Sequence, residues 1–409
     1  METVKLKKYA ELLVRAGGNV QKGQLVVIQC AVDHAPFARL AQTCAYDAGA
    51  SEVVIDWIDD FSTREKYFRA ADGVFDVFPS WIVARLKEHD DRGAVYLAIP
   101  SSDPDLLNGA DAGRIRRATV ARQTATKTHS ELTMTHARRW SVAAVPSVPW
   151  ARKVFPRLPE EEAVESLWAH ILKSARADGD DPIKDWETHG NNFKKRVAYL
   201  NQQAFKALRF TNALGTNLTV GLVKGHIWTG GRIKAQDGID FFPNLPTEEI
   251  FTMPDRTGTE GRVVASMPLS YQGNLIEGFE MTFKEGRAVS WRADQNQAAL
   301  DDIIQMDEGS HYLGEVALVA HSSPIAQMNT LFYKTLFDEN ASCHLALGKA
   351  YPTCLEGGVK MTEAERDAAG VNDSLLHVDF MFGTSDTRVA GIGGDGGETV
   401  FFDGGEFVV

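Results

Sequence analysis

Cysteine and positive charge are both scarce in this chain. The 409 residues include only 4 Cys, and no two of them form a CxxC pair. A disulfide scaffold would need a denser set, so the cysteine content fits a reducing cytosol and predicts a cytoplasmic protein. There are 43 Lys and Arg against 55 Asp and Glu, which gives a formal net charge of -12. Neutralising phosphate groups requires a basic surface, so we expect no nucleic-acid partner.

Long hydrophobic runs are missing as well. No segment approaches the ~20 consecutive apolar residues that a membrane-spanning helix requires. Charged residues interrupt residues 1–14 every few positions, unlike the apolar centre of a signal peptide. We therefore expect a soluble chain with no membrane contact. Its composition, 44% hydrophobic and 24% charged, is that of an ordinary globular protein with a substantial core.

The first third of the chain alternates between short apolar runs and helical patterns. Apolar runs at residues 24–30, 51–57 and 94–100 predict buried strands, and a fourth strand is predicted at 140–146. Segments with helical spacing of apolar residues separate the first three, at 35–48, 64–71 and 80–88. This alternation is typical of a parallel α/β sheet with helices on both faces.

The pattern changes after residue 204. Short runs of strand-forming residues follow one another, separated by Gly and Asn turns such as 214–217 and 284–287. These features favour an antiparallel, strand-rich α+β domain. We therefore predict two domains, an α/β domain at residues 1–204 and a strand-rich domain at residues 205–409 that carries the functional site.

The segment 376–383 offers half of a metal site. It reads Leu-His-Val-Asp-Phe-Met-Phe-Gly, so a strand here would direct His377 and Asp379 to one face and Val378 and Phe380 to the other. A strand holds two such ligands rigidly, which suits a metal site. A buried, hydrogen-bonded His–Asp pair explains the same pattern, so the segment needs support from elsewhere in the chain.

Several carboxylates and one further imidazole could complete the site. Glu315 opens the wholly apolar run 316–320, where a buried charge needs a partner. Glu249 directly precedes the apolar pair Ile250-Phe251, while its neighbour Glu248 fits an exposed turn. The segment 339–348 adds Glu339 and His344, and Tyr351 follows with a hydroxyl that can donate a hydrogen bond.

Together these residues make three Glu, two His and one Asp. Nitrogen and oxygen ligands without thiolate suit Zn, Co or Mn, and several carboxylates suit a pair of ions. Each motif has an ordinary structural explanation when taken alone. Residue types and placement therefore leave both possibilities open, a site for two divalent metal ions and a set of unrelated structural residues.

Four segments, at residues 244–252, 313–319, 339–348 and 377–381, decide between these possibilities. Taken together and in this order, they resemble the thermophilic-type metallo-aminopeptidase family of aminopeptidases T, S and PepS-like enzymes. The likeness extends over nearly the whole chain. It implies that two divalent metal ions are bound by Glu249, Glu315, Glu339, His344, His377 and Asp379.

The resemblance also carries expectations about mechanism and assembly. It implies an N-terminal α/β domain, a C-terminal active-site domain and a homodimer that encloses its sites. Metal ions would hold the free α-amino group and the scissile carbonyl of a peptide and activate a water molecule. Glu315 would be a metal ligand or accept the proton of that water, and Tyr351 would assist by hydrogen bonding to the oxyanion.

Two other functions are compatible with the same ligand residues, and one further motif fits a turn. A different dinuclear amidohydrolase or a dipeptidase would use the same ligands but would not require a free α-amino group. A binding protein with structural metal ions would bind metal without turnover. The GxGxxG match at residues 391–396 lies too near Val409 for the helix and strand of a dinucleotide site, so a turn-rich hairpin is expected there.

Overall fold

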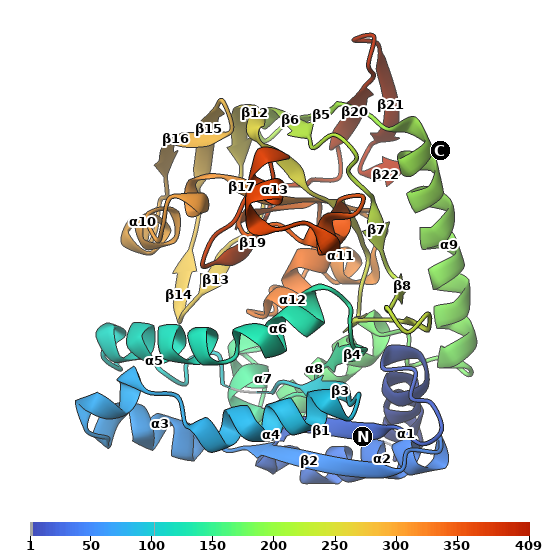
Figure 1. Cartoon of the computed structure of the whole chain (residues 1–409), viewed down its shortest axis with the longest axis vertical. Helices are drawn as coiled ribbons and strands as arrows, with labels where there is room; N and C mark the ends of the chain where they lie inside the picture. Colours follow the sequence, from blue (N-terminus) through green and yellow to red (C-terminus); the bar gives the residue numbers. More distant parts are fainter. Residues whose placement is uncertain (1–2, 102) are drawn as a thin grey trace. The chain divides into compact units, whose positions relative to one another are not determined.

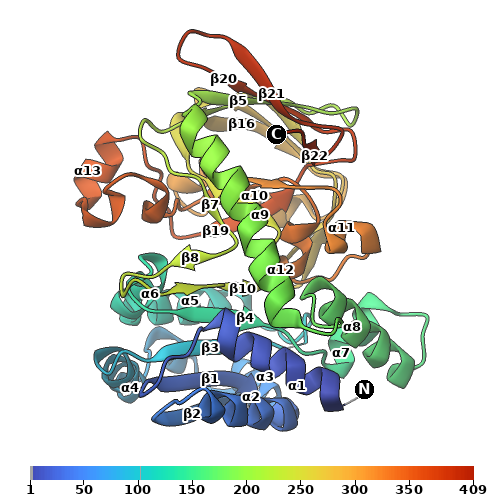
Figure 2. The same cartoon turned by 90° about the vertical axis from the view of Figure 1, so that its right-hand side faces the viewer.

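The structure, a computed structural model, describes residues 3–101 and 103–409 (Figures 1 and 2). It divides into two compact units, each with its own core. The first contains the residues up to Thr188 together with Arg232–Pro246, and the second contains His189–Gly231 together with Thr247–Val409. The predicted domain boundary near residue 204 lies just past helix α9, Pro182–Gln203, whereas this division falls inside that helix.

The first unit is built on a parallel sheet, as predicted. Its strands are ordered β10-β4-β3-β1-β2, and every neighbouring pair is parallel. The bounds are β1 Leu25–Ala31, β2 Glu52–Ile58, β3 Val95–Ile99, β4 Trp140–Ala143 and β10 Asn244–Leu245. Strands β1 and β3 are almost wholly buried, which explains why their sequences are apolar without alternation.

Helices surround this sheet in both views (Figures 1 and 2). Their bounds are α1 Thr3–Leu12, α2 Ala35–Asp47, α3 Asp60–Arg69, α4 Ser80–Asp91, α5 Ala112–Ala125, α6 Lys127–Met134, α7 Val148–Val154 and α8 Glu160–Ser174. The short β10 lies far along the chain from β4. In sequence it directly follows the two-stranded hairpin of β8 Ile233–Lys234 and β9 Asp240–Phe241. It pairs with β4, and Val142 N also donates to Pro243 O at 2.7 Å.

The second unit is strand-rich and antiparallel, which confirms the predicted fold class. A five-stranded sheet has the order β19-β18-β17-β11-β7. Its bounds are β7 Thr229–Gly230, β11 Glu249–Thr252, β17 Leu313–Val319, β18 His344–Gly348 and β19 His377–Met381. All four pairings are antiparallel. This sheet contains the segments that the sequence singled out.

A second, eight-stranded sheet has the order β16-β15-β12-β6-β5-β20-β21-β22. Its bounds are β5 Ala207–Thr211, β6 Asn217–Leu222, β12 Pro254–Val264, β15 Glu280–Lys284, β16 Arg287–Arg292, β20 Arg388–Ile392, β21 Glu398–Asp403 and β22 Glu406–Phe407. The GxGxxG match lies at the end of β20 and in its turn to β21, so the expected hairpin is present (Figure 2).

Short elements complete the second unit. They are β13 Leu269–Tyr271, β14 Asn274–Ile276, α10 Gln297–Ile304, α11 Pro324–Met328, α12 Thr335–Asp338 and α13 Glu363–Ala368. A single apolar core joins the two sheets, because residues of β5, β6 and β15 and residues of β17, β18 and β19 belong to one buried cluster. The five-stranded sheet therefore buries one face in this core and leaves the other face for polar side chains.

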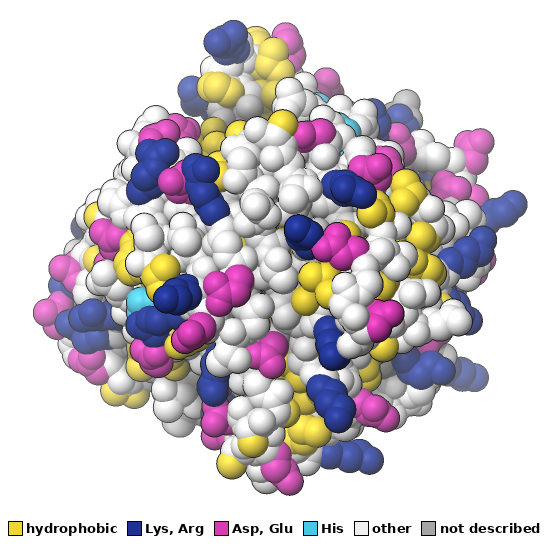
Figure 3. All heavy atoms as spheres, turned by 90° about the horizontal axis from the view of Figure 1, so that it is seen from above, with side chains coloured by type: hydrophobic (Ala, Val, Ile, Leu, Met, Phe, Trp, Pro, Cys, Tyr) yellow, Lys and Arg dark blue, Asp and Glu magenta, His cyan; other side chains and the backbone are white. Residues whose placement is uncertain are grey.

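The surface carries both signs of charge. Figure 3 shows one face on which Lys and Arg are interspersed with Asp and Glu, without a continuous basic area. Among the described helices, none combines the length and the apolar character that crossing a bilayer would require. The four cysteines are buried and free of disulfides.

Candidate metal centre

One face of the five-stranded sheet gathers five of the six predicted ligands. Directly paired residues of antiparallel strands point to the same side, and alternate residues along a strand share a face. These rules place five ligands on one face: Glu249 of β11, Glu315 of β17, His344 of β18, and His377 and Asp379 of β19. The opposite face carries Ile250, Val316, Leu318, Leu345, Leu347, Val378 and Phe380, all in the core cluster.

A β-bulge at Gly314 turns Glu315 toward this face. Leu313 and Glu315 are two residues apart, so a regular strand would place them on the same side. The register shifts between them, and Leu313 packs in the core while Glu315 joins the ligand face. Gly314 permits the bulge, because a Cβ there would lie 2.3 Å from Gly348 O.

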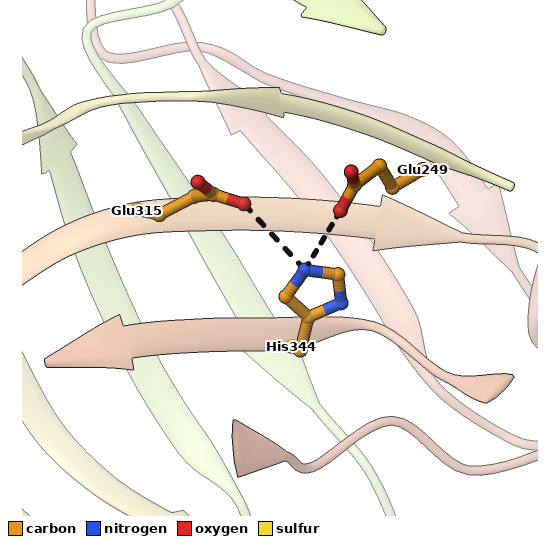
Figure 4. A group of neighbouring side chains, drawn as sticks. All are labelled: Glu249, Glu315 and His344. Atoms are coloured by element: carbon orange, nitrogen blue, oxygen red, sulfur yellow. Dashed lines mark ion pairs between the residues drawn. The ribbon is translucent and has the colours of Figure 1, made fainter. Parts of the chain in front are cut away.

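Glu249, Glu315 and His344 form the first group of candidate ligand atoms, close enough to hold one metal ion (Figure 4). His344 Nε2 lies 3.0 Å from Glu249 Oε2 and 3.5 Å from Glu315 Oε1. All three side chains are buried, and His344 has no exposed surface. Figure 4 shows that they come from three different strands and converge on one point.

Glu315, His377 and Asp379 form the second group. His377 Nε2 lies 3.6 Å from Glu315 Oε2 and 3.4 Å from Asp379 Oδ1. Glu315 therefore belongs to both groups, and it directs one carboxylate oxygen toward each histidine. This arrangement brings together His377 and Asp379, as the sequence pattern of β19 predicted.

Backbone carbonyls orient both imidazole rings. His377 Nδ1 lies 2.7 Å from Lys349 O, and His344 Nδ1 lies 3.2 Å from Ser342 O. A carbonyl oxygen only accepts, so each Nδ1 carries the proton that it donates. Each Nε2 is then the atom that faces the carboxylates, which is the tautomer of a metal-binding histidine fixed by a hydrogen bond on its other nitrogen.

Glu339 approaches the site from outside the sheet. It begins the 3-10 turn η5, Glu339–Ala341, which contacts β19. Burial raises the pKa of Glu339 well above its usual range, and the nearby carboxylates of Asp379 and Glu249 raise it further. The structure thus brings Glu339 close to the other predicted ligands, although it belongs to neither of the two tighter groups.

Negative charge dominates the cluster in the metal-free protein. Burial, followed by the charges of Glu249 and Asp379, raises the pKa of Glu315 to about 7, against the opposing effect of His344. Burial alone would lower the pKa of His377, but Asp379 and Glu315 outweigh it and raise that pKa to about 9. The cluster therefore takes up protons to offset its carboxylates, and divalent cations would replace those protons.

The residues present fit metal ions. Carboxylate oxygens and imidazole nitrogens are the ligands of Zn, Co and Mn sites. His344 Nε2 has no hydrogen-bond partner among the described residues, although Glu249 Oε2 lies 3.0 Å away. With its proton on Nδ1, His344 presents the lone pair of Nε2 to carboxylates that also only accept, so a cation is what suits the space between them.

Tyr351 borders the cluster. Its ring packs against the imidazole of His377, with 5.1 Å between the ring centroids, and against Phe251 at 5.9 Å. Burial raises the pKa of Tyr351 well above its usual range, and the carboxylates of Glu315 and Asp379 add to the effect. The phenol therefore keeps its proton and can donate it in a hydrogen bond.

The structure separates the adjacent carboxylates of Glu248 and Glu249. Glu249 lies in the first ligand group, as chosen from the sequence. Glu248 is buried rather than exposed, and its Oε1 lies 3.7 Å from His189 Nε2 of helix α9. The exposed turn expected at Glu248 is thus wrong, because β11 begins between two other strands of the sheet.

Two alanines on the ligand face were not predicted from the sequence. Ala346 pairs with Glu315 on one side and with Asp379 on the other, and Ala317 pairs with His344 and Phe251. Both are fully buried on the ligand face. Their small side chains leave room between the ligands. The only signal in the sequence is that Ala346 and Ala317 each lie two residues from a predicted ligand.

Comparisons with known proteins agree over the whole chain. The family model described as thermophilic metalloprotease (M29) matches residues 2–407. Aminopeptidase 2 of Geobacillus stearothermophilus is 42% identical over 402 residues, 98% of this chain and 97% of that protein. Aminopeptidase T of Thermus thermophilus is 41% identical over 404 residues, 99% of this chain and 98% of that protein.

Solved structures give the same result for the fold. Wild-type AmpT from Thermus thermophilus superposes with a TM-score of 0.93 and 39% identity, covering 99% of both chains. A 2,5-dihydroxypyridine dioxygenase from Pseudomonas putida KT2440 reaches a TM-score of 0.55 at 11% identity, over 99% of this chain and 96% of that chain. The second likeness concerns the fold alone, since one fold serves different chemistries.

Proposed function

The chain belongs to the thermophilic metalloprotease family M29, and from that premise we propose that its ligand cluster holds two divalent metal ions. The protein is a metallo-aminopeptidase, a hydrolase that acts on peptide bonds. Its substrates are peptides with a free N-terminus, from which it releases the first amino acid. We propose the number of ions, their ligands and the roles of individual residues from the geometry of the cluster.

The position of Glu315 carries the proposal of two ions. Its Oε1 lies 3.5 Å from His344 Nε2, and its Oε2 lies 3.6 Å from His377 Nε2. A carboxylate that directs one oxygen to each of two imidazoles is suited to bridge two cations. Glu249 and His344 would complete one site and His377 and Asp379 the other, with Glu339 beside both.

The chemistry at the site divides between the ions and the protein. Bound Zn, Co or Mn would act as a Lewis acid and lower the pKa of a water molecule. Tyr351 keeps its proton and donates a hydrogen bond to the oxygen that becomes negative when the peptide carbonyl is attacked. Both oxygens of Glu315 face histidines, so the roles of metal ligand and proton acceptor compete at the same atoms.

The proposed ions also suit the substrate. A peptide with a free N-terminus offers an uncharged α-amino nitrogen that could serve as a metal ligand beside the carbonyl oxygen. Acetylation removes the basicity of that nitrogen, so an N-acetylated peptide should not be cleaved. Cleavage of an acetylated peptide would instead indicate a different dinuclear amidohydrolase.

Metal identity, assembly and location belong to the proposal too. We assign Zn, Co or Mn from the donor atoms, a homodimer from the family resemblance, and the cytoplasm from four buried, unbridged cysteines. Gel filtration with light scattering would test the homodimer. Metal analysis of the protein purified without added ions would test the first assignment.

Replacement of the β19 ligands tests the site. His377→Ala and Asp379→Asn should each lower kcat at least ~100-fold on aminoacyl chromogenic amides and reduce the number of bound ions. Restoring Zn²⁺, Co²⁺ or Mn²⁺ to the stripped wild-type enzyme should restore activity. Asp403→Asn, at an exposed position at the end of β21, serves as the control and should behave like the wild type. Full activity in both β19 variants would refute the assignment.

A further inference from the structure

The side-chain amide of Asn340 is fully buried beside the metal centre and makes hydrogen bonds at both ends. Its Oδ1 accepts from Glu248 N at 2.6 Å, and its Nδ2 donates to Leu336 O at 2.9 Å. The main-chain carbonyl of Asn340 accepts from Ser323 Oγ at 2.8 Å. Ser323 is itself 3% exposed. The residue is thus held from three directions.

These bonds join two segments that are distant in sequence and adjacent to ligands. Glu248 N belongs to the residue before Glu249, and Asn340 directly follows Glu339. One amide group therefore spans 92 residues of sequence and ties the start of β11 to the turn η5. Neither Glu248 nor Asn340 belongs to the two groups of ligand atoms described above.

Glu339 needs such a tie more than the other ligands do. Glu315, His344, His377 and Asp379 lie within paired strands, whose hydrogen-bond ladders fix their backbone. Glu249 pairs with Val319 in the same way, whereas Glu339 lies on a short turn without a ladder. Ligands are held accurately when their supporting residues are locked by hydrogen bonds.

The chemistry of the contact requires an amide. Glu248 N can only donate and Leu336 O can only accept, so the orientation of the Asn340 amide is unambiguous. Alanine would leave the buried N–H of Glu248 without this acceptor and would remove the donor to the half-buried carbonyl of Leu336. Aspartate would place an oxygen against the carbonyl of Leu336.

We propose that Asn340 is a positioning residue that sets the relative placement of Glu249 and Glu339 for metal binding. The inference rests on the proposed two-metal function and names a residue that supports it without touching an ion. Replacing a residue that supports metal ligands typically weakens metal binding by roughly 10–100-fold. We expect a loss of this size when the Asn340 side chain is removed. The folded state should survive, since the sheet ladders remain.

Metal titration of the stripped protein tests this role directly. Co²⁺ is added to wild type and to Asn340→Ala, with bound metal measured by equilibrium dialysis and the visible absorption of Co²⁺ recorded. We expect weaker binding and an altered spectrum in Asn340→Ala. The matched control is Asn212→Ala. Asn212, in the turn between β5 and β6, also bonds the backbone at both ends, to Phe382 O at 3.0 Å and Thr216 N at 3.1 Å, and neither partner is next to a predicted ligand in sequence.

The possible outcomes distinguish failure of the positioning role from failure of the proposed function. Unchanged Co²⁺ affinity in Asn340→Ala overturns the positioning role, and so does an equal loss in Asn212→Ala. Failure of the wild type to bind Co²⁺ would refute the proposed function instead. If Asn340→Ala does not fold, Ser323→Ala decides, because it frees the Asn340 carbonyl and keeps the amide. Its affinity should fall by a smaller factor, and an unchanged affinity would count against the inference.

Discussion

The role of the Tyr351 hydroxyl can be tested separately from the role of its ring. The ring packs edge-on against His377, and phenylalanine would keep that packing. The hydroxyl is the part that can donate a hydrogen bond, and the high pKa of Tyr351, raised by burial and by Glu315 and Asp379, ensures that its proton is present near neutral pH. A role in catalysis and a role in packing therefore predict different results for the same substitution.

Tyr351→Phe should lower kcat by roughly 10²–10³-fold, the usual effect of removing one donor to an oxyanion. Metal content and the thermal midpoint should stay near those of the wild type, because the ring and the ligands are unchanged. Steady-state kinetics, metal analysis and calorimetry on the same preparation check all three. A variant with wild-type kcat would assign Tyr351 to packing alone.

Among the elements of the site, strand β18 contributes both His344 and the small residue Ala346 to the ligand face. Ala346 lies between Glu315 and Asp379 on the neighbouring strands, and its side chain leaves the space that two cations would need. Valine is a good strand former, so it should be accommodated by the backbone while it fills that space. The face toward the core offers a matched position on the same strand.

Ala346→Val should therefore reduce the number of bound metal ions and lower kcat, with the fold retained. The matched variant Leu347→Val alters the opposite face of β18, where Leu347 packs in the core. It should cost roughly 1 kcal/mol of stability and leave metal binding unchanged. Metal stoichiometry and circular dichroism of the two variants make the comparison. Equal metal content in both would show that Ala346 does not define the space.

The elements also show how far the sequence could predict the site. Period-two alternation was sufficient for His377 and Asp379, since β19 is a regular strand with one buried face. Glu315 is different, because the bulge at Gly314 cannot be read from alternation. Glu339 lies on a turn, so its residue type made it a candidate and only the family resemblance implied that it is a ligand. Asn340 had no signal and Ala346 only its spacing of two residues from His344, since their roles depend on which segments become neighbours.

The fold, too, was predictable from the sequence only in part. Apolar runs predicted the strands of the first sheet because helices bury both of its faces. Strand β10 has two residues and pairs with β4 across about a hundred residues of sequence, as its register shows. Local periodicity carries no information about such a pairing. Long-range contacts of short segments are therefore the part that required the structure.

For the molecule as a whole, a histidine far from the metal centre in sequence should affect acid stability. His136 is 8% exposed, and its ring lies edge-on to Phe241 with 6.0 Å between centroids. Burial lowers the pKa of His136 from 6.5 to about 4. The unfolded chain then binds a proton at a higher pH than the folded protein does, so stability falls as pH decreases from about 6.5 to about 4.

The size of this effect follows from the pKa difference. At about pH 5 the unfolded state binds the proton and the folded state largely does not, which lowers the free energy of unfolding by about 2 kcal/mol relative to neutral pH. Above the unfolded pKa the ring is neutral in both states and makes no difference. His136 has φ +50°, a conformation that asparagine tolerates, so His136→Asn removes the titration with little backbone strain.

His136→Asn should consequently lose less stability than the wild type between about pH 7 and about pH 5, by about 2 kcal/mol. Calorimetry at both pH values measures the difference, and each variant serves as its own reference because other groups titrate equally in both. His321→Asn, at an exposed position, is the matched control and should follow the wild type. If His136→Asn loses as much stability in acid as the wild type, the buried ring is not what couples folding to protons.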